Sequence, residues 1–172
     1  MKKSLCSILL FAYLSATATA QSPIASVVAG YSFTHNDQGS GYANLKGWFG
    51  QASFTLTNLV SLNLETDNYY GSFQGSSVNQ HSYVAGPQFT FNSSGKLQPF
   101  VNVEAGDQRS SSAGSVSHAF TAQFAGGVQL KLSQRFGLYL SPVEYDLATP
   151  SGGAQHSFSS KFGVMVNFGQ KH

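Results

Sequence analysis

The C-terminal stretch SSKFGVMVNFGQKH (159–172) decides the fold. Its apolar residues Phe162, Val164, Val166 and Phe168 occupy every second position, and small or polar residues stand between them. A period of two is typical of a β-strand with one apolar face and one polar face. The apolar face must therefore pack either against a protein core or against lipid, and the rest of the chain has to decide between the two.

Period-two alternation recurs along the whole chain after residue 23. The alternating runs are 24–34, 45–56, 59–69, 81–91, 97–107, 118–132, 136–146 and 157–168. Most have nearly the length of a tilted membrane strand, which is about 9–11 residues. No helical period competes over a comparable window. The sequence therefore predicts an all-β fold of eight antiparallel strands.

The connections between these runs alternate between two lengths. Short turns fall at 57–58, 92–96 and 133–135, and longer polar loops fall at 35–44, 70–80, 108–117 and 147–155. Outer-membrane barrels have short periplasmic turns and longer extracellular loops. The pattern predicts an up-and-down transmembrane barrel whose two ends face different compartments.

The N-terminal segment has the pattern of a secretory signal peptide. Lys2 and Lys3 form its basic region, residues 5–14 are its apolar region, and Ala18-Thr19-Ala20 is a small-residue cleavage motif. We therefore expect a cleaved signal peptide over residues 1–20 and a single barrel domain over residues 21–172. Cleavage would remove the only cysteine, Cys6, so the mature chain would form no disulfide.

Charge and glycine content favour lipid outside the barrel. Charged residues make up 9% of the chain, against about a quarter in soluble domains. In a lipocalin-like soluble barrel, the polar residues that alternate with the apolar ones would form the outer surface, and they carry too few charges for that. The glycines among these polar residues instead suit the narrow interior of an eight-stranded barrel. We expect lipid to contact the apolar set, represented by Val27, Tyr31, Phe33, Trp48, Phe54, Leu62, Leu64, Tyr83, Val101, Val103, Phe120 and Phe124.

The seventh run does not keep one alternation throughout. Leu138 and Leu140 share their parity with Pro142 and Glu144. A β-bulge near Pro142 would shift the parity, so that both leucines face lipid while Glu144 points inward.

The chain resembles the small OmpA/OmpX-like eight-stranded outer-membrane barrels. The resemblance rests on the features above and on the stretches KLQPFVNVEAGD (96–107), GGVQLKL (126–132) and VEYD (143–146). It implies that Phe162, Val164, Val166 and Phe168 form an assembly signal, which the barrel-assembly machinery reads. Here four residues follow Phe168, whereas the Phe of the family is often the last residue.

The inward face carries the candidate lumen residues. By parity and by the family resemblance, a polar network in the lumen would consist of Glu65, Asn102, Glu104, Lys131, Glu144 and Lys161. Buried charges are costly unless they are paired. We therefore expect a packed and paired lumen in preference to an ion path.

Four histidines border the four long loops, one histidine per loop. His35, His81, His118 and His156 share parity with outward aromatic residues, which predicts that they lie at the loop-end membrane interface. We interpret them as amphipathic interface residues. A second hypothesis is contact with lipopolysaccharide phosphates, or a pH-sensitive rim. Four outward residues spread around a barrel cannot converge on one metal ion.

No pattern of catalytic, cofactor-binding or metal-binding residues emerges. Ser82 stands next to His81, but adjacent strand residues point to opposite faces and cannot form a catalytic pair by themselves. Removal of Lys2 and Lys3 from nine basic residues leaves seven, against seven acidic ones, so no basic patch indicates nucleic acid. We therefore expect a protein that is not an enzyme and has no cofactor.

The function expected from sequence is that of a monomeric outer-membrane barrel of a Gram-negative bacterium. Its role would be structural or surface interaction, such as adhesion or envelope integrity. Its expected partners are membrane lipid including lipopolysaccharide, the barrel-assembly machinery and an unknown surface ligand at the long loops. Three alternatives stay open: a lipid-A-modifying enzyme, a lipocalin-like soluble ligand-binding barrel, and a narrow porin-like pore.

Membrane fractionation followed by a heat-modifiability gel tests whether the chain forms a closed barrel whose apolar face contacts lipid. We expect the protein in the outer-membrane fraction, released by detergent and migrating faster unheated than boiled, because a closed barrel stays compact in the gel. A protein soluble in the periplasm without detergent would invert every face assignment and favour the ligand-binding barrel.

Overall fold

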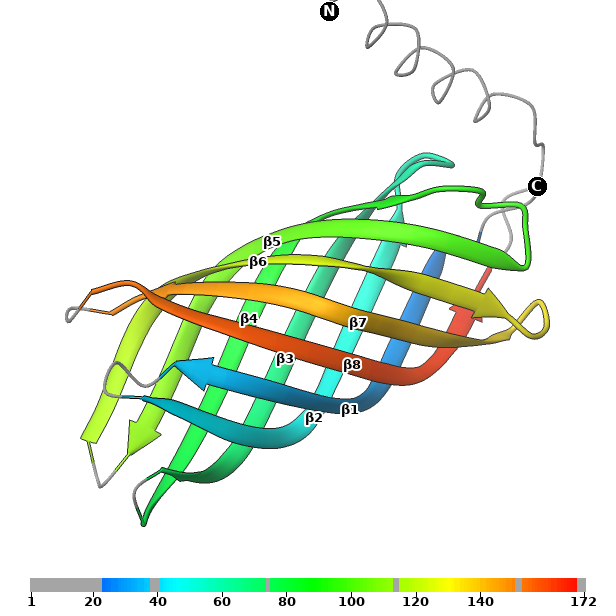
Figure 1. Ribbon diagram of the computed structural model, residues 1–172. Helices are drawn as coiled ribbons and strands as arrows, with labels where there is room; N and C mark the ends of the chain where they lie inside the picture. The colour runs from blue at the N-terminus through cyan, green and yellow to red at the C-terminus, as the bar shows by residue number, and fades with distance from the viewer. Residues whose placement is uncertain (1–22, 38–40, 74, 113–114, 151–152, 170–172) are drawn as a thin grey trace, which may run out of the picture.

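Eight antiparallel strands close into one barrel (Figure 1). The computed structural model describes residues 23–37, 41–73, 75–112, 115–150 and 153–169. Each strand pairs with its neighbours in sequence, and the first pairs with the last. The predicted fold class is therefore confirmed, whereas the predicted signal peptide lies outside the described residues. The strands are β1 (Ala25–Asp37), β2 (Tyr42–Thr55), β3 (Val60–Phe73), β4 (Ser76–Thr90), β5 (Leu97–Ser112), β6 (Ser115–Lys131), β7 (Phe136–Thr149) and β8 (Gln155–Phe168).

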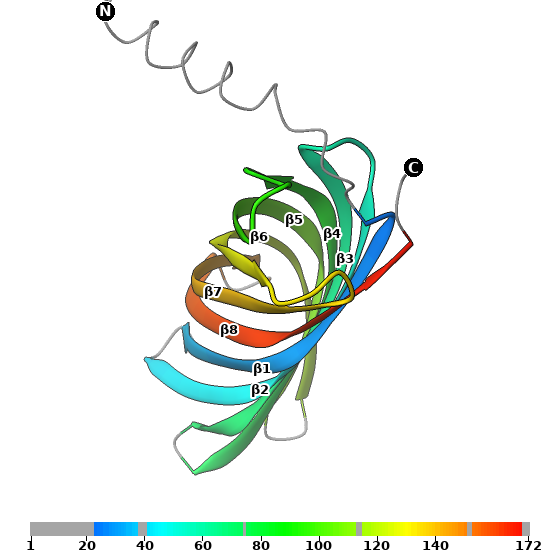
Figure 2. The same ribbon diagram turned by 90° about the vertical axis from the view of Figure 1, so that its right-hand side faces the viewer.

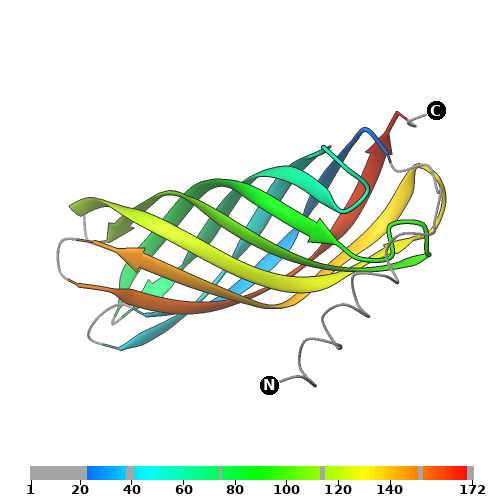
Figure 3. The ribbon, with the colours of Figure 1, turned by 90° about the horizontal axis from the view of Figure 1, so that it is seen from above.

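The strands are steeply tilted around an elongated barrel (Figures 2 and 3). We call the end where β1 begins and β8 finishes the turn end, and the opposite end the loop end. The described residues contain no helical segment with the length and apolar character of a membrane span.

Two hairpins are longer than the sequence predicts. Pairing of β3 with β4 continues to Phe73 opposite Ser76, and pairing of β5 with β6 continues to Ser112 opposite Ser115. The predicted loops 70–80 and 108–117 are therefore mostly wrong, because they are paired strand. Their Ser, Asn, Gln and Gly residues are typical of loops, but backbone pairing in an antiparallel ladder does not require apolar side chains.

Two of the turn-end connections have the same hydrogen-bond pattern. The hydroxyl of Thr57 accepts from the amides of Leu59 and Val60. The hydroxyl of Ser133 accepts from the amides of Arg135 and Phe136 in the same way. These hydroxyls satisfy backbone donors that a tight turn leaves without ladder partners.

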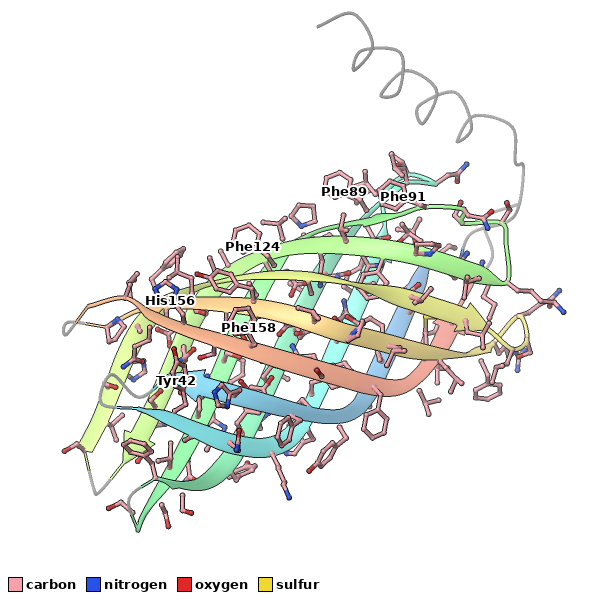
Figure 4. The ribbon with its side chains drawn as sticks, viewed as in Figure 1. Tyr42, Phe89, Phe91, Phe124, His156 and Phe158 are labelled. Carbon is pink, nitrogen blue, oxygen red and sulfur yellow. The ribbon has the colours of Figure 1, made fainter. Side chains whose placement is uncertain are left out.

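The apolar set faces outward, as predicted. Its large side chains are exposed along all eight strands, with Trp48 at 51% and Phe162 at 59%. In Figure 4, Phe89 and Phe91 lie toward the turn end, while Tyr42 and His156 lie toward the loop end. Apolar residues exposed all around a barrel, with aromatic residues near both ends, are typical of a lipid-facing surface.

The predicted bulge in β7 is confirmed. The pairing of β7 with β8 shifts register between Ser141 and Glu144, and both Pro142 and Val143 are exposed. Glu144 is consequently buried at 1% exposure, although Leu140 with the same parity faces outward. Proline has no amide hydrogen and is tolerated where a bulge interrupts the ladder.

The seam between β1 and β8 closes on two glycines. Gly30 lies opposite Gly163, and both point toward the crowded interior. A Cβ added to Gly30 would lie 2.1 Å from the carbonyl oxygen of Phe162 and 2.7 Å from the ring of Phe49. The strands therefore approach one another too closely for any side chain at this point.

We predict that Gly30→Ala destabilises the folded barrel by about 1–3 kcal/mol, the usual cost of overpacking. Unfolding of the refolded protein in urea, followed by the heat-modifiability gel, measures the change. Gly50→Ala is the matched control, because a Cβ there meets only the side chain of Thr66 at 3.8 Å. Equal effects of the two variants would contradict the close approach at the seam.

Candidate functional site

A buried lysine lies at the centre of the lumen. The ammonium group of Lys161 on β8 lies 2.8 Å from Asp67 Oδ1 and 2.6 Å from Glu144 Oε1, and it also pairs with Glu65. These side chains are 0% to 1% exposed. The acidic partners come from β3 and β7, so the cluster joins strands from separate parts of the barrel wall.

The lumen holds more acid than base. Its buried carboxylates, among the described residues, are Glu65, Asp67, Glu104, Glu144 and Asp146, and its fully buried cation is Lys161. Neutral donors support two of the carboxylates. Asp67 accepts from Ser82 at 3.0 Å and from Gln123 at 3.3 Å, and Asp146 accepts from Ser159 at 2.8 Å. Hydrogen bonds from side chains on β4, β6 and β8 therefore help to stabilise the buried negative charge.

Apolar side chains pack inside the barrel on both sides of this charge cluster. Toward the turn end the packed group is Val28, Phe49, Phe100, Tyr139 and Met165. Toward the loop end it is Ala43, Leu45, Tyr69 and Val78. The Phe49 ring lies 5.6 Å from Lys161 Nζ. A lumen surrounded by such groups has a low effective dielectric, which strengthens the ion pairs within it.

The structure brings together only part of the predicted lumen network. Glu65, Glu144 and Lys161 are in contact, and Asn102 and Glu104 are buried on the inner face of β5. Lys131 lies apart from them, because its ammonium group donates to the backbone oxygen of Ser93 at 2.9 Å, beside a cavity of about 230 Å³ at the turn end.

Sequence reasoning missed two acidic members of the cluster and its apolar surroundings. Asp67 shares its inward parity with Glu65, but the predicted network does not include it. Asp146 becomes inward only through the bulge in β7. Phe49, Phe100 and Tyr139 stand next to outward residues in WFG, PFV and LYL, and strict alternation in these triplets would have placed them inside.

Glu65, Asp67 and Glu144 are close enough to hold a metal ion, since their oxygens lie within 4.8 Å of one another. Lys161 Nζ already lies among them at ion-pair distance. The ammonium group supplies the positive charge that a metal ion would supply, so the donor set does not require a metal.

Each loop-end histidine is held by a side chain on a neighbouring strand. His35 contacts Asn44 at 2.8 Å, His81 contacts Asn68 at 2.5 Å, His118 contacts Asp107 at 3.0 Å and His156 contacts the Tyr145 hydroxyl at 2.5 Å. All four contacts use Nδ1 of the imidazole. The four rings lie on different strands around the outer face and do not converge.

The serines that stand next to these histidines point the other way. Ser82 is buried in the lumen and donates to Asp67, whereas His81 on the outer face contacts Asn68. Alternation along the strand separates the two side chains, as expected. Likewise, Ser157 is buried at 5% exposure, whereas His156 on the outer face contacts the hydroxyl of Tyr145.

The closed topology, the apolar exterior and the charged interior define an integral β-barrel of the bacterial outer membrane. A search of family models found no match, and a search of curated proteins found none either. Solved structures of eight-stranded outer-membrane barrels do match.

The protein is similar to neisserial surface protein A, with a TM-score of 0.76 and 15% identity over 84% of this chain and 97% of that one. It is also similar to Ail, the attachment invasion locus protein of Yersinia pestis, with a TM-score of 0.53 and 15% identity over 84% and 99% of the two chains. A third match is OprG from Pseudomonas aeruginosa, with a TM-score of 0.57 and 8% identity over 87% and 98%. At these identities the matches show the fold, which confirms the resemblance to small OmpA/OmpX-like barrels.

We predict that Lys161→Met destabilises the barrel by about 3–5 kcal/mol, because it leaves buried carboxylates without a cation. Urea unfolding of the refolded protein measures the loss. Lys131→Met is the matched control and should change stability little, since that lysine is half-buried at the turn end. A similar loss in both variants would argue against the cluster as the cause.

Combining Lys161→Met with Glu65→Gln and Glu144→Gln should recover much of the lost stability, because the neutral amides no longer need a cation. Additive losses in the triple variant would show that packing of the lysine stem, and not its charge, stabilises the lumen.

Proposed function

We propose that this protein is a non-enzymatic outer-membrane barrel with a closed lumen, which acts at the cell surface through its loop end in adhesion or envelope integrity. The observation that carries the proposal is the Lys161 cluster with apolar layers on both sides. Side chains so placed would block a continuous aqueous path for a solute, because an eight-stranded barrel is only wide enough for its own side chains.

The surface role is supported by the two long hairpins at the loop end. β3–β4 and β5–β6 continue as paired strands beyond the aromatic residues Tyr83 and Phe120. Paired polar strands present a more fixed surface than an unpaired loop of the same composition. Ail, which shares the fold, is named for attachment and invasion, and one structure of it contains the heparin analogue sucrose octasulfate.

The proposed partners follow from the location of each surface. Membrane lipid, including lipopolysaccharide in the outer leaflet, would surround the exposed apolar set. The barrel-assembly machinery would read Phe162, Val164, Val166 and Phe168, which lie on the outer face of β8. An unidentified surface ligand would bind the β3–β4 and β5–β6 hairpins.

We predict that the refolded protein gives no single-channel current in planar bilayers at neutral pH. The closed lumen is the physical reason, and an open porin reconstituted in the same bilayers is the positive control. Discrete openings that persist in independent preparations would overturn the closed lumen and favour the narrow pore.

Attachment is tested by shortening the hairpins without touching the membrane part. A variant in which residues 72–77 are replaced by a two-residue Asn-Gly turn keeps Val78 of the apolar layer and should keep its heat-modifiable band. Bacteria that display it should bind less to epithelial cells or to immobilised heparin than bacteria that display the native protein. Arg135→Gln at the opposite end is the matched control. Unchanged binding in the shortened variant would remove this hairpin from the proposed surface.

A further inference from the structure

The outer face repeats one two-residue pattern around the loop end. An exposed aromatic side chain stands two positions from each histidine on the same face: Phe33 with His35, Tyr83 with His81, Phe120 with His118, and Phe158 with His156. Aromatic residues of this kind mark the membrane interface. Two residues of strand are about 6–7 Å long, so each histidine lies just outside that interface.

Two permanent cations complete this ring. Lys46 on β2 lies opposite Phe33 and Tyr70, which are both exposed. Arg109 on β5 is paired with His81 on one side and His118 on the other. We call the outward set His35, Lys46, His81, Arg109, His118 and His156 the basic belt. Among the side chains that the structure describes at this level, Asp107 is the acidic one that faces outward.

The basic belt and the lumen contain different kinds of charged side chains. Five carboxylates are buried inside the barrel with Lys161, while, among the described side chains, the charged and imidazole groups that face outward at the loop end are those of the basic belt and Asp107. Lys46 and Arg109 are permanent positive charges on this rim, and phosphate accepts charge-assisted hydrogen bonds from such groups. The rim of the barrel is therefore suited to an anionic ligand that lies at the height of the lipid headgroups.

His81, Arg109 and His118 form the tightest part of the belt. They are direct cross-strand neighbours on β4, β5 and β6, and such neighbours have Cβ atoms about 4.5–5.5 Å apart. An arginine between two imidazoles can share the oxygens of one phosphate, since phosphate accepts several charge-assisted hydrogen bonds at once.

The contact with Asp107 determines which ring nitrogen of His118 carries the hydrogen. A carboxylate can only accept, so Nδ1 of His118 carries the hydrogen of the 3.0 Å contact. Nε2 then donates to an anion only when the imidazole gains a second proton. The charged or titratable groups that face His118 in the described strands are Asp107 and Arg109, both on β5.

We propose that the basic belt, and above all the row His81–Arg109–His118, binds the phosphate groups of lipid A in the outer leaflet, and that binding takes up a proton at His118. The inference rests on the proposed lipopolysaccharide environment and is independent of the proposed attachment through the hairpins.

The test is binding of purified lipid A to the full-length barrel refolded in detergent, measured by native mass spectrometry. Bis-phosphorylated lipid A should bind more tightly than dephosphorylated lipid A. The variant His81→Gln/Arg109→Gln/His118→Gln should lose about tenfold or more in affinity for the phosphorylated form. Lys96→Gln at the turn end is the matched control and should bind as the native protein does.

Several outcomes would overturn the proposal. One is equal binding of the two lipid A forms, and another is native affinity in the triple variant. Competition by inorganic phosphate at concentrations that match the lipid would point to a free-anion site instead of a headgroup site. If the triple variant fails to give the heat-modifiable band, Arg109→Gln alone carries the same comparison. Unchanged cell attachment of the shortened hairpin variant, together with intact lipid A binding, would count against the hairpin proposal alone.

The proton is tested by lowering the pH from about 8 to about 6, the range in which an imidazole changes its charge. Native affinity for phosphorylated lipid A should rise as the pH falls. His118→Arg, which is charged throughout, should bind tightly at both pH values, whereas His118→Gln should bind weakly at both. A pH response that survives unchanged in His118→Gln would remove the proton from this residue.

Discussion

The ion pairs of Lys161 are the interaction on which the interior depends. One ammonium group joins carboxylates of β3 and β7 to β8, so a single side chain links β3 to the paired strands β7 and β8, which it does not neighbour in the barrel wall. The cost of removing the Lys161 ammonium group from water is offset because three carboxylates surround it. The burial of these carboxylates is in turn offset by the ammonium group. The apolar groups on either side lower the local dielectric and so strengthen this mutual dependence.

The outer surface of the barrel has to be apolar, in contrast to the charged interior. Lipid offers no hydrogen bonds, so every backbone group must be paired and the outward side chains must be apolar. Closure of β1 on β8 meets the first requirement, and the approach at Gly30 and Gly163 makes that closure possible. Five acidic side chains and Lys161 are buried inside the barrel, whereas Lys46, Arg109 and the four loop-end histidines lie on the outer face.

The two proposals concern different parts of the loop end. In the first proposal, the hairpins of β3–β4 and β5–β6 would extend beyond the membrane and meet a partner outside the cell. In the second, the basic belt would lie below them, at the level of the headgroups. A barrel held in the outer leaflet by its belt would present its hairpins at a fixed height and orientation.

Alternation by itself determined most of the fold. It determined the eight strands, the lipid-facing set and the bulge at Pro142, because a period of two assigns every side chain to one of two faces. It could not determine which inward charges meet. That depends on the register between strands distant in sequence, which brought Asp67 to Lys161 and left Lys131 at the turn end. It also could not show that polar stretches such as 70–80 continue as paired strand, or that Arg109 lies between His81 and His118. Only the tertiary structure decided these points, because cross-strand partners are chosen by closure of the whole barrel and not by any local run of residues.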